Sequence, residues 1–256
     1  LRRVPDLVPW IDENVDFPSS MVDRITPATT DRTRMELAER FGVEDAWPVR
    51  AESFIQWVVE DRFRGGRPAF EEVGVHVVED VTPYERMKLR LLNASHQALG
   101  HLGLLAGHTM VHEAMRDEDL AGFVGSYMRH EALPTLGPVP GIDLEAYCRS
   151  LEERFAGEAV RDTLERQVVD ASDRLATFLV PVIRDRLDAG DGIGHSALIL
   201  AGWYQRLDAF EQSGADALDL PDPLRDRLLA AVREDRARPG AFLETPEVFG
   251  GLASSP

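Results

Sequence analysis

Apolar residues recur along most of this chain with the three- and four-residue spacing that is typical of amphipathic helices. The pattern predicts a helix that ends at Gly42, followed later by a long and strongly apolar helix over residues 82–105. Thr82-Pro83 with Glu85 supplies a start signal for that long helix. A further helix is expected over about 110–128, and three or more helices between 144 and about 238.

Two short runs have a different pattern. Residues 49–59 and 73–78 are rich in Val, Ile and aromatic side chains, which favours strands. A Gly/Pro turn at 64–68 separates them. The Pro/Gly segment 133–143 either marks a boundary between subdomains or, more simply, forms a surface loop inside one domain. We therefore expect a mainly α, multi-helical fold with a small β element around residues 49–78.

Composition narrows the class of protein. The 256 residues are 44% hydrophobic and carry a formal charge of −17, which argues against nucleic acid or an anionic membrane as a partner. The single cysteine, Cys148, excludes a disulfide framework and suits a reducing, cytoplasmic location. No run of eighteen apolar residues is present, so no membrane span is expected.

The sequence lacks the glycine motifs of nucleotide sites. No Gly-x-Gly-x-x-Gly follows a strand pattern, and Gly190, Gly192 and Gly194 follow a helix, as in a helix stop and loop. No Gly-x-Ser-x-Gly hydrolase motif is present either. The chain begins with Leu1 rather than Met, and we expect a fragment or processed piece of a longer protein.

One residue is conspicuous by its type. The chain has 28 basic residues, of which 27 are arginine and only Lys88 is lysine. A codon bias that replaces Lys by Arg is one explanation for the skew, and a salt-adapted acidic surface is another. A lysine that survives such a bias is a candidate for a task that arginine cannot perform, such as losing its proton near neutral pH.

Lys88 lies within the long apolar helix together with other polar groups. At 100° per residue, Glu85, His96 and Asn93 lie about 60°, 80° and 140° from Lys88, all on one side of the helix. One interpretation is a hydrogen-bonded core network or a face turned to water. The other is a site for alcohol oxidation, in which Lys88 is the general base, Asn93 donates to the developing alkoxide and His96 orients the substrate hydroxyl. That chemistry also needs a nicotinamide held by residues outside this chain.

Several segments of the sequence resemble those of a known family. The segments MVDRITPATT, EDAWPV, FIQWVVEDRF, GRPAFEEVGV, VTPYERMKLRLLNASH and LGPVPGIDL are similar to the mannitol dehydrogenase family, the zinc-independent long-chain polyol dehydrogenases that include fructuronate and tagaturonate reductases. The resemblance extends from about Ile11 to Pro181 and weakens towards the C-terminus. Its most specific element is the Lys-x4-Asn-x2-His pattern of Lys88, Asn93 and His96.

The resemblance implies roles for four residues of the long helix. Lys88 matches the family's general base, and Asn93 matches one of two amides that bind the reacting oxygen. His96 matches the histidine that orients the substrate. Glu85 matches the acid that relays protons to solvent.

Four further residues match substrate-binding positions. These are Val22 and Asp23 in MVDRITP, Arg166, and Arg174, which stands where the family usually has a lysine. An arginine is not an equivalent hydrogen-bonding group, so recognition at that end of the substrate is in question.

The resemblance also implies partners and a fold. The expected cofactor is NAD or NADP, without a metal, and the expected substrate is a small polyol or ketose. Residues 1–256 as a whole would be the C-terminal substrate domain, helical like that of 6-phosphogluconate dehydrogenase. The N-terminal dinucleotide-binding domain would precede Leu1 and be absent, and the isolated fragment would be inactive.

Alternatives remain at this stage. Mannitol and fructose are favoured as substrates because Asp23 would repel a carboxylate, yet Arg166 and Arg174 are suited to clamp one, as in fructuronate or tagaturonate reductases. A non-catalytic helical interaction module is the alternative of another class. His108 and His112, four residues apart and next to Glu113, have a spacing that could hold zinc. The pair lacks a third ligand at a recognisable spacing, so a zinc site is set aside. His76 and His101 are most simply core residues.

Overall fold

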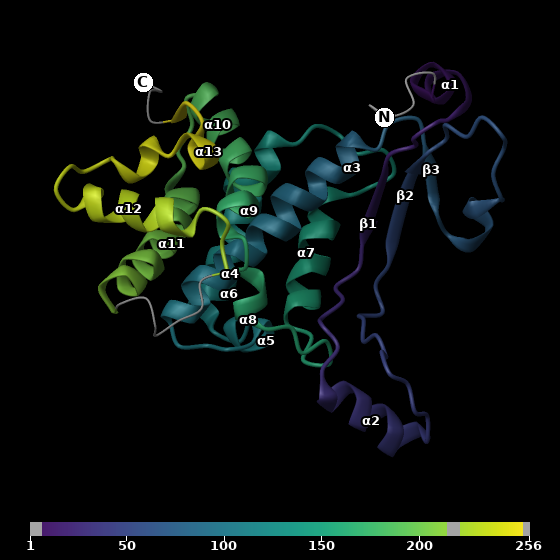
Figure 1. Ribbon diagram of the computed structural model, residues 1–256, viewed down its shortest axis with the longest axis horizontal. Coiled ribbons are helices and arrows are strands. Elements are labelled where there is room, and N and C mark those ends of the chain that lie inside the picture. Colours follow the sequence, from purple (N-terminus) through teal and green to yellow (C-terminus); the bar gives the residue numbers. More distant parts are fainter. Residues whose placement is uncertain (1–6, 214–220, 253–256) are drawn as a thin grey trace. The chain divides into compact units, whose positions relative to one another are not determined.

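The computed structural model describes residues 7–213 and 221–252 and divides the chain into two compact units, 1–86 and 87–256. Most described residues are helical, and the β structure is a single three-stranded sheet (Figure 1). The predicted fold class is therefore confirmed. The division between the units falls inside the long helix, not in the Pro/Gly loop 133–143, which lies within the second unit.

The first unit contains the sheet. Its strand order is β1-β2-β3, with β1 antiparallel to β2 and β2 parallel to β3. The elements are α1 (Leu7–Asn14), β1 (Ser20–Asp23), α2 (Asp31–Phe41), β2 (Gln56–Glu60) and β3 (His76–Val78), with α3 (Thr82–Met87) at its end. β2 and β3 confirm the small β element that was predicted around 49–78.

Two expectations for the first unit were incomplete or wrong. β1 was missed, because its four residues precede a Thr-rich turn and are too few for a period-2 pattern to stand out. His76 is exposed at the start of β3, so its expected place in the core was wrong. The helix that ends at Gly42 is confirmed: Thr30 caps α2 and Gly42 adopts the left-handed conformation, φ +64°, that lets the chain leave the helix.

The second unit is helical throughout its described part. After α4 (Ala94–Leu105) its helices are α5 (Val111–Ala114), α6 (Glu118–Tyr127), α7 (Leu144–Phe155), α8 (Leu164–Gln167), α9 (Ala171–Phe178), α10 (Val180–Asp188), α11 (Gly194–Ser213), α12 (Arg225–Asp235) and α13 (Pro246–Phe249). The single helix expected over 110–128 is two, because the Asp117 side chain accepts from the N–H groups of Asp119 and Leu120 and starts α6 afresh.

α4 forms the centre of this unit and contacts α6, α8, α9 and α11. Two glycines allow the close approach. A Cβ at Gly100 would lie 2.7 Å from a Val168 methyl group, and one at Gly202 on α11 would lie 2.7 Å from a Leu102 methyl group. The predicted burial of the long helix is confirmed, since Leu91, Leu99 and their neighbours are inaccessible to solvent. A substituent at either glycine would push a neighbouring helix away.

The long helix runs from Thr82 to Leu105, as predicted, but it is not α-helical throughout. Residues Lys88–Asn93 form a π-helical segment between α3 and α4. A second π segment, Met128–Ala132, follows α6. π segments of this length are uncommon and are found frequently at functional sites.

A buried carboxylate in the second π segment caps α11. Glu131 accepts hydrogen bonds from the N–H groups of His195 (2.6 Å) and Ser196 (2.8 Å) and from the Ser196 hydroxyl (2.5 Å). Its side chain is almost inaccessible to solvent. The negative charge therefore lies at the positive end of the longest helix, where it satisfies N–H groups that have no partner within the helix.

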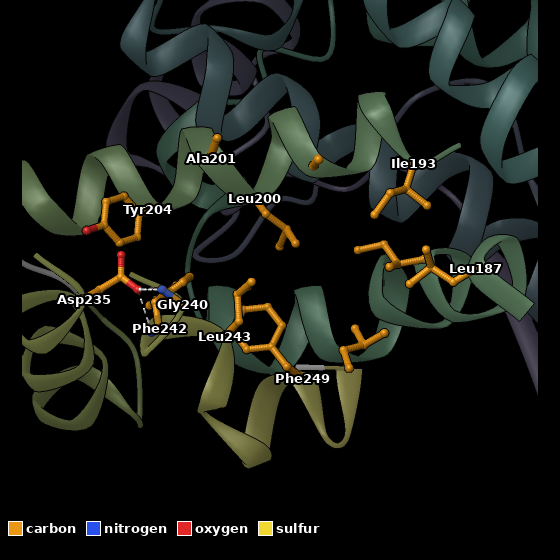
Figure 2. Close-up of a pocket in the computed structure, with 13 residues that line it drawn as sticks. Leu187, Ile193, Leu200, Ala201, Tyr204, Asp235, Gly240, Phe242, Leu243 and Phe249 are labelled. Atoms are coloured by element: carbon orange, nitrogen blue, oxygen red, sulfur yellow. Dashed lines mark hydrogen bonds between the residues drawn. The ribbon is translucent and has the colours of Figure 1, made fainter. Parts of the chain in front are cut away.

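An open apolar groove of about 400 Å³ lies along one side of α11 (Figure 2). Its lining comes from α10, α11 and the C-terminal segment, and includes Leu187, Leu200, Tyr204, Leu243 and Phe249. The polar group at its end, Asp235, already accepts from the N–H groups of Gly240 and Phe242. Across residues 7–213 and 221–252, no helix combines the length and apolarity needed to cross a membrane.

We expect Glu131→Gln to lower stability by about 2 kcal/mol, because the charge-assisted bonds to α11 are lost. Burial raises the pKa of the Glu131 carboxyl, but hydrogen bonds from Ser196 and His195 outweigh it and hold that pKa below its usual value. The carboxylate therefore stabilises the fold above about pH 4.3, and this contribution is lost as pH falls through the lower folded-state pKa.

Thermal unfolding of the full-length protein between pH 3 and pH 7 measures this effect. The variant should melt at lower temperature at pH 7 and should show a shallower loss of stability below pH 5. Glu153→Gln, on an exposed side chain of α7, is the matched control. Equal melting curves for the two variants would contradict the capping role.

Candidate functional site

The predicted site residues are divided between the two units. Val22 and Asp23 lie on β1, where they pair with Trp57 and Gln56 of β2. Alternation along the strand leaves Val22 half exposed and buries Asp23 almost completely. Glu85 is exposed in the first turn of α3. Lys88, Asn93, His96, Arg166 and Arg174 belong to the second unit.

The π segment changes the arrangement of Lys88 and Asn93. The Ala94 N–H donates to the carbonyl of Leu89, five residues back, so residues five apart in this segment are one turn apart. Lys88 is five residues before Asn93. The 140° separation expected from an α-helix was therefore wrong, and the five-residue repeat brings positions 88 and 93 of the backbone close to the same side of the helix.

His96 lies in the first turn of α4, beyond the π segment. Its ring is buried against Phe155 of α7, with the ring centroids 4.5 Å apart. The Asn93 side chain is partly buried, and its Oδ1 is inaccessible yet has no hydrogen-bond partner among the described residues. A buried amide oxygen of this kind is costly unless a ligand or water satisfies it.

Arg166 is held by a carboxylate that the sequence analysis did not single out. Its Nε and a terminal nitrogen donate to the two oxygens of buried Asp162 at 2.7 and 2.6 Å. Gln167 Nε2 donates to the same carboxylate at 2.8 Å, and Gln97 Nε2 of α4 donates to the Gln167 carbonyl at 2.7 Å. The guanidinium is thereby fixed relative to the helix that carries Asn93 and His96.

Arg174 is in a different environment. It lies on α9, which contacts both α4 and the π segment. Burial and then the nearby charge of Arg166 lower the pKa of Arg174. No hydrogen bond or ion pair of its guanidinium is found within the described part of the chain. The Ser172 N–H and hydroxyl that begin α9 both donate to Asp222, which anchors this end of the helix.

The histidines of the sequence analysis have other contacts. His108 Nε2 lies 3.3 Å from Asp117, and the Glu113 carboxylate accepts from Thr109 and Met110 at the start of α5. The described residues contain no group of three or more metal-ligating side chains. His101 is a core residue, as expected.

His101 Nδ1 pairs with Arg206 at 3.2 Å. Burial and then the Arg206 charge lower the pKa of His101 well below its usual value, so the ring is neutral and accepts from the guanidinium.

Comparisons with known proteins identify two family models that the chain matches. Residues 80–256 match the family model of the mannitol dehydrogenase C-terminal domain, and residues 2–72 match that of the mannitol dehydrogenase Rossmann domain. The similarity thus extends to the C-terminus, and the chain includes a segment of the Rossmann domain, a division that the sequence analysis did not make.

Several relatives are similar over almost the whole chain. The mannitol 2-dehydrogenase of Phaeosphaeria nodorum is 41% identical over 97% of this chain and 44% of its own length. That of Aspergillus niger is 38% identical over 96% of this chain and 51% of its own length. The chain therefore spans about half the length of the curated relatives that it matches.

Two solved structures have the same fold. A Pseudomonas fluorescens mannitol 2-dehydrogenase in ternary complex with NAD and D-mannitol superimposes with a TM-score of 0.89 and 42% identity, over 98% of this chain and 51% of that one. A substrate-free D-sorbitol dehydrogenase gives a TM-score of 0.85 and 32% identity, over 98% and 51%. With the family model matched over more than half of its residues, this chain belongs to the mannitol dehydrogenase family.

Proposed function

We propose that this chain carries the substrate-binding and catalytic residues of a nicotinamide-dependent polyol dehydrogenase. The reaction interconverts a secondary alcohol of a hexitol and the corresponding ketose, with mannitol and fructose as the preferred pair. The observation that carries the proposal is the π turn, which brings the only lysine of the chain and the Asn93 amide to the same side of a buried helix. The named relatives supply the choice of mannitol.

The proposed roles follow from the groups themselves. The Lys88 amine, once neutral, accepts the proton of the reacting hydroxyl. The amide N–H of Asn93 donates to the oxygen as negative charge develops on it. His96, whose ring is fixed against Phe155, orients the hydroxyl. Glu85 is exposed and is proposed to pass the proton to solvent.

NAD or NADP, when bound, accepts the hydride that leaves the alcohol carbon. The orphaned Asn93 Oδ1 fits a reaction centre that is completed by a bound ligand. The chain has no glycine fingerprint, so we propose that the pyrophosphate contacts come from Rossmann-domain residues outside this chain, and that this domain is its functional partner. We also propose that the chain alone is inactive and that no metal takes part.

Recognition of the distal substrate hydroxyls is proposed to involve Val22, Asp23, Arg166 and Arg174, as the family resemblance implies. Asp162 neutralises Arg166 through two short hydrogen bonds, which suits an uncharged polyol. Asp23 likewise suits a hydroxyl rather than a carboxylate. These carboxylates support mannitol and fructose as the first choice.

A second candidate function rests on Arg174. Its guanidinium is half-buried and has no ion pair within the described part of the chain, so its N–H groups remain available to a substrate carboxylate. A hexuronate oxidoreductase, such as a fructuronate or tagaturonate reductase, is therefore the alternative. A non-catalytic interaction module needs no proton acceptor at position 88, and the Lys88 experiment separates it from both enzymes.

We expect Lys88→Arg and Lys88→Ala to lower kcat for mannitol oxidation by at least about 100-fold, because neither side chain accepts a proton near neutral pH. Steady-state kinetics of the full-length protein with NAD and mannitol measure this. Arg184→Lys, at an exposed position of α10, is the matched exchange and should leave kcat unchanged. Near-normal turnover of Lys88→Arg would refute the assigned general base.

The choice of substrate is tested by comparing kcat/KM for the reduction of fructose and of fructuronate. We expect fructose to be preferred in the full-length protein, and Arg174→Ala to change the ratio little. A preference for fructuronate above tenfold, equal to about 1.4 kcal/mol of differential transition-state binding, would overturn the choice. Loss of that preference in Arg174→Ala, but not in Arg184→Ala, would then locate the carboxylate site at Arg174.

A further inference from the structure

The π segment leaves one backbone carbonyl of a buried helix without a backbone partner, and another part of the second unit has to supply one. Where a helix returns from the five-residue to the four-residue repeat, one carbonyl loses its backbone N–H partner. At the end of the π segment, the N–H of Ala94 donates to the carbonyl of Leu89, five residues back. The next carbonyl belongs to Arg90, inside a buried stretch of the helix where water cannot satisfy it.

The hydroxyl of Tyr127 meets this need. Tyr127 is the last residue of α6 and has no accessible surface. Its hydroxyl donates to the Arg90 carbonyl at 3.2 Å. Burial raises the pKa of Tyr127, so the phenol keeps its proton and remains a donor. A phenylalanine would fill the same space without supplying the hydrogen bond.

The Arg90 side chain anchors the same turn from a second direction. One terminal nitrogen donates to the Thr135 carbonyl at 3.0 Å and to Asp185 of α10 at 2.5 Å. Arg90 is thus held through both its backbone and its side chain, by three segments that are distant in the sequence. Lys88 and Asn93 flank Arg90 in the widened turn, and their alignment depends on the turn staying open.

We propose that Tyr127 and Arg90 are positioning residues: they hold the helix in its five-residue repeat at 88–93 and so keep the Lys88 amine and the Asn93 amide on one side. Neither touches the substrate. The inference rests on the proposed function, because the alignment matters only if these two groups act on one substrate oxygen. Without the anchors, the segment relaxes towards the four-residue repeat, which separates the two groups by about 140°.

The test uses the full-length protein with NAD and mannitol. Tyr127→Phe removes one hydroxyl, and we expect kcat to fall about tenfold or more with KM changed less than threefold, as for a misaligned catalytic group. The pH at which kcat reaches half its maximum should also move, because the surroundings of the Lys88 amine change. Tyr204→Phe is the matched control: it removes the hydroxyl of a tyrosine that lines the apolar groove, and the loss should leave kcat and the pH profile as in the wild type (Figure 2).

Asp185→Asn is the second variant, chosen because Asp185 is exposed and its change should leave the fold intact. It weakens the Arg90 anchor, and we expect a several-fold fall in kcat with KM retained. Wild-type kcat and pH profile in Tyr127→Phe overturn the proposal. If that variant does not fold, the same result in Asp185→Asn overturns it.

Lys88→Ala in the same assay distinguishes a failure of the proposed function from a failure of the positioning role. Normal turnover of Lys88→Ala would refute the proposed function itself. An inactive Lys88→Ala together with a Tyr127→Phe that behaves like Tyr204→Phe would refute only the positioning role.

Discussion

The central helix of the second unit contains one buried carbonyl that cannot be paired by the helix backbone itself. A π turn leaves such a group wherever it rejoins an α-helix, and burying it without a partner costs about 1–3 kcal/mol. Here the Tyr127 hydroxyl supplies the partner, and Arg90 ties the same turn to Thr135 and Asp185. The end of α6, the segment after it and α10 are therefore all tied to the same turn of the central helix.

The five-residue repeat of this helix also bears on the proposed chemistry of Lys88 and Asn93. An α-helix offers stacked pairs only at three- and four-residue spacing, whereas Lys88 and Asn93 are five apart. A widened turn lets them share one side without a kink from Pro or Gly. The proposed pair of a proton acceptor and an amide donor thus uses helix geometry rather than a flexible loop, which favours a fixed distance between them.

The sequence predicted those features that local signals specify. The bounds of the long helix were correct because Thr82-Pro83 marks its start and an unbroken apolar pattern continues to Leu105. The π turn was missed, because periodicity analysis assumes a constant 100° per residue and no residue type marks the insertion. Tyr127 was missed because its hydrogen-bond partner, Arg90, is distant in the sequence. Asp162 was missed because an i, i+4 pair with Arg166 is ordinary on a helix surface, and only its burial in the fold sets it apart.

The strong preference of this chain for arginine has a consequence at the distal end of the proposed site. At position 174 this preference supplies a planar guanidinium, which stays charged even when half-buried. Its neighbour Arg166 is already paired with Asp162 through its Nε edge, so the carboxylate offsets that charge and the remaining N–H donors suit a neutral hydroxyl. Selectivity between a neutral and an anionic substrate would therefore depend more on Arg174 than on Arg166, while the proposed proton acceptor, Lys88, would serve both substrates.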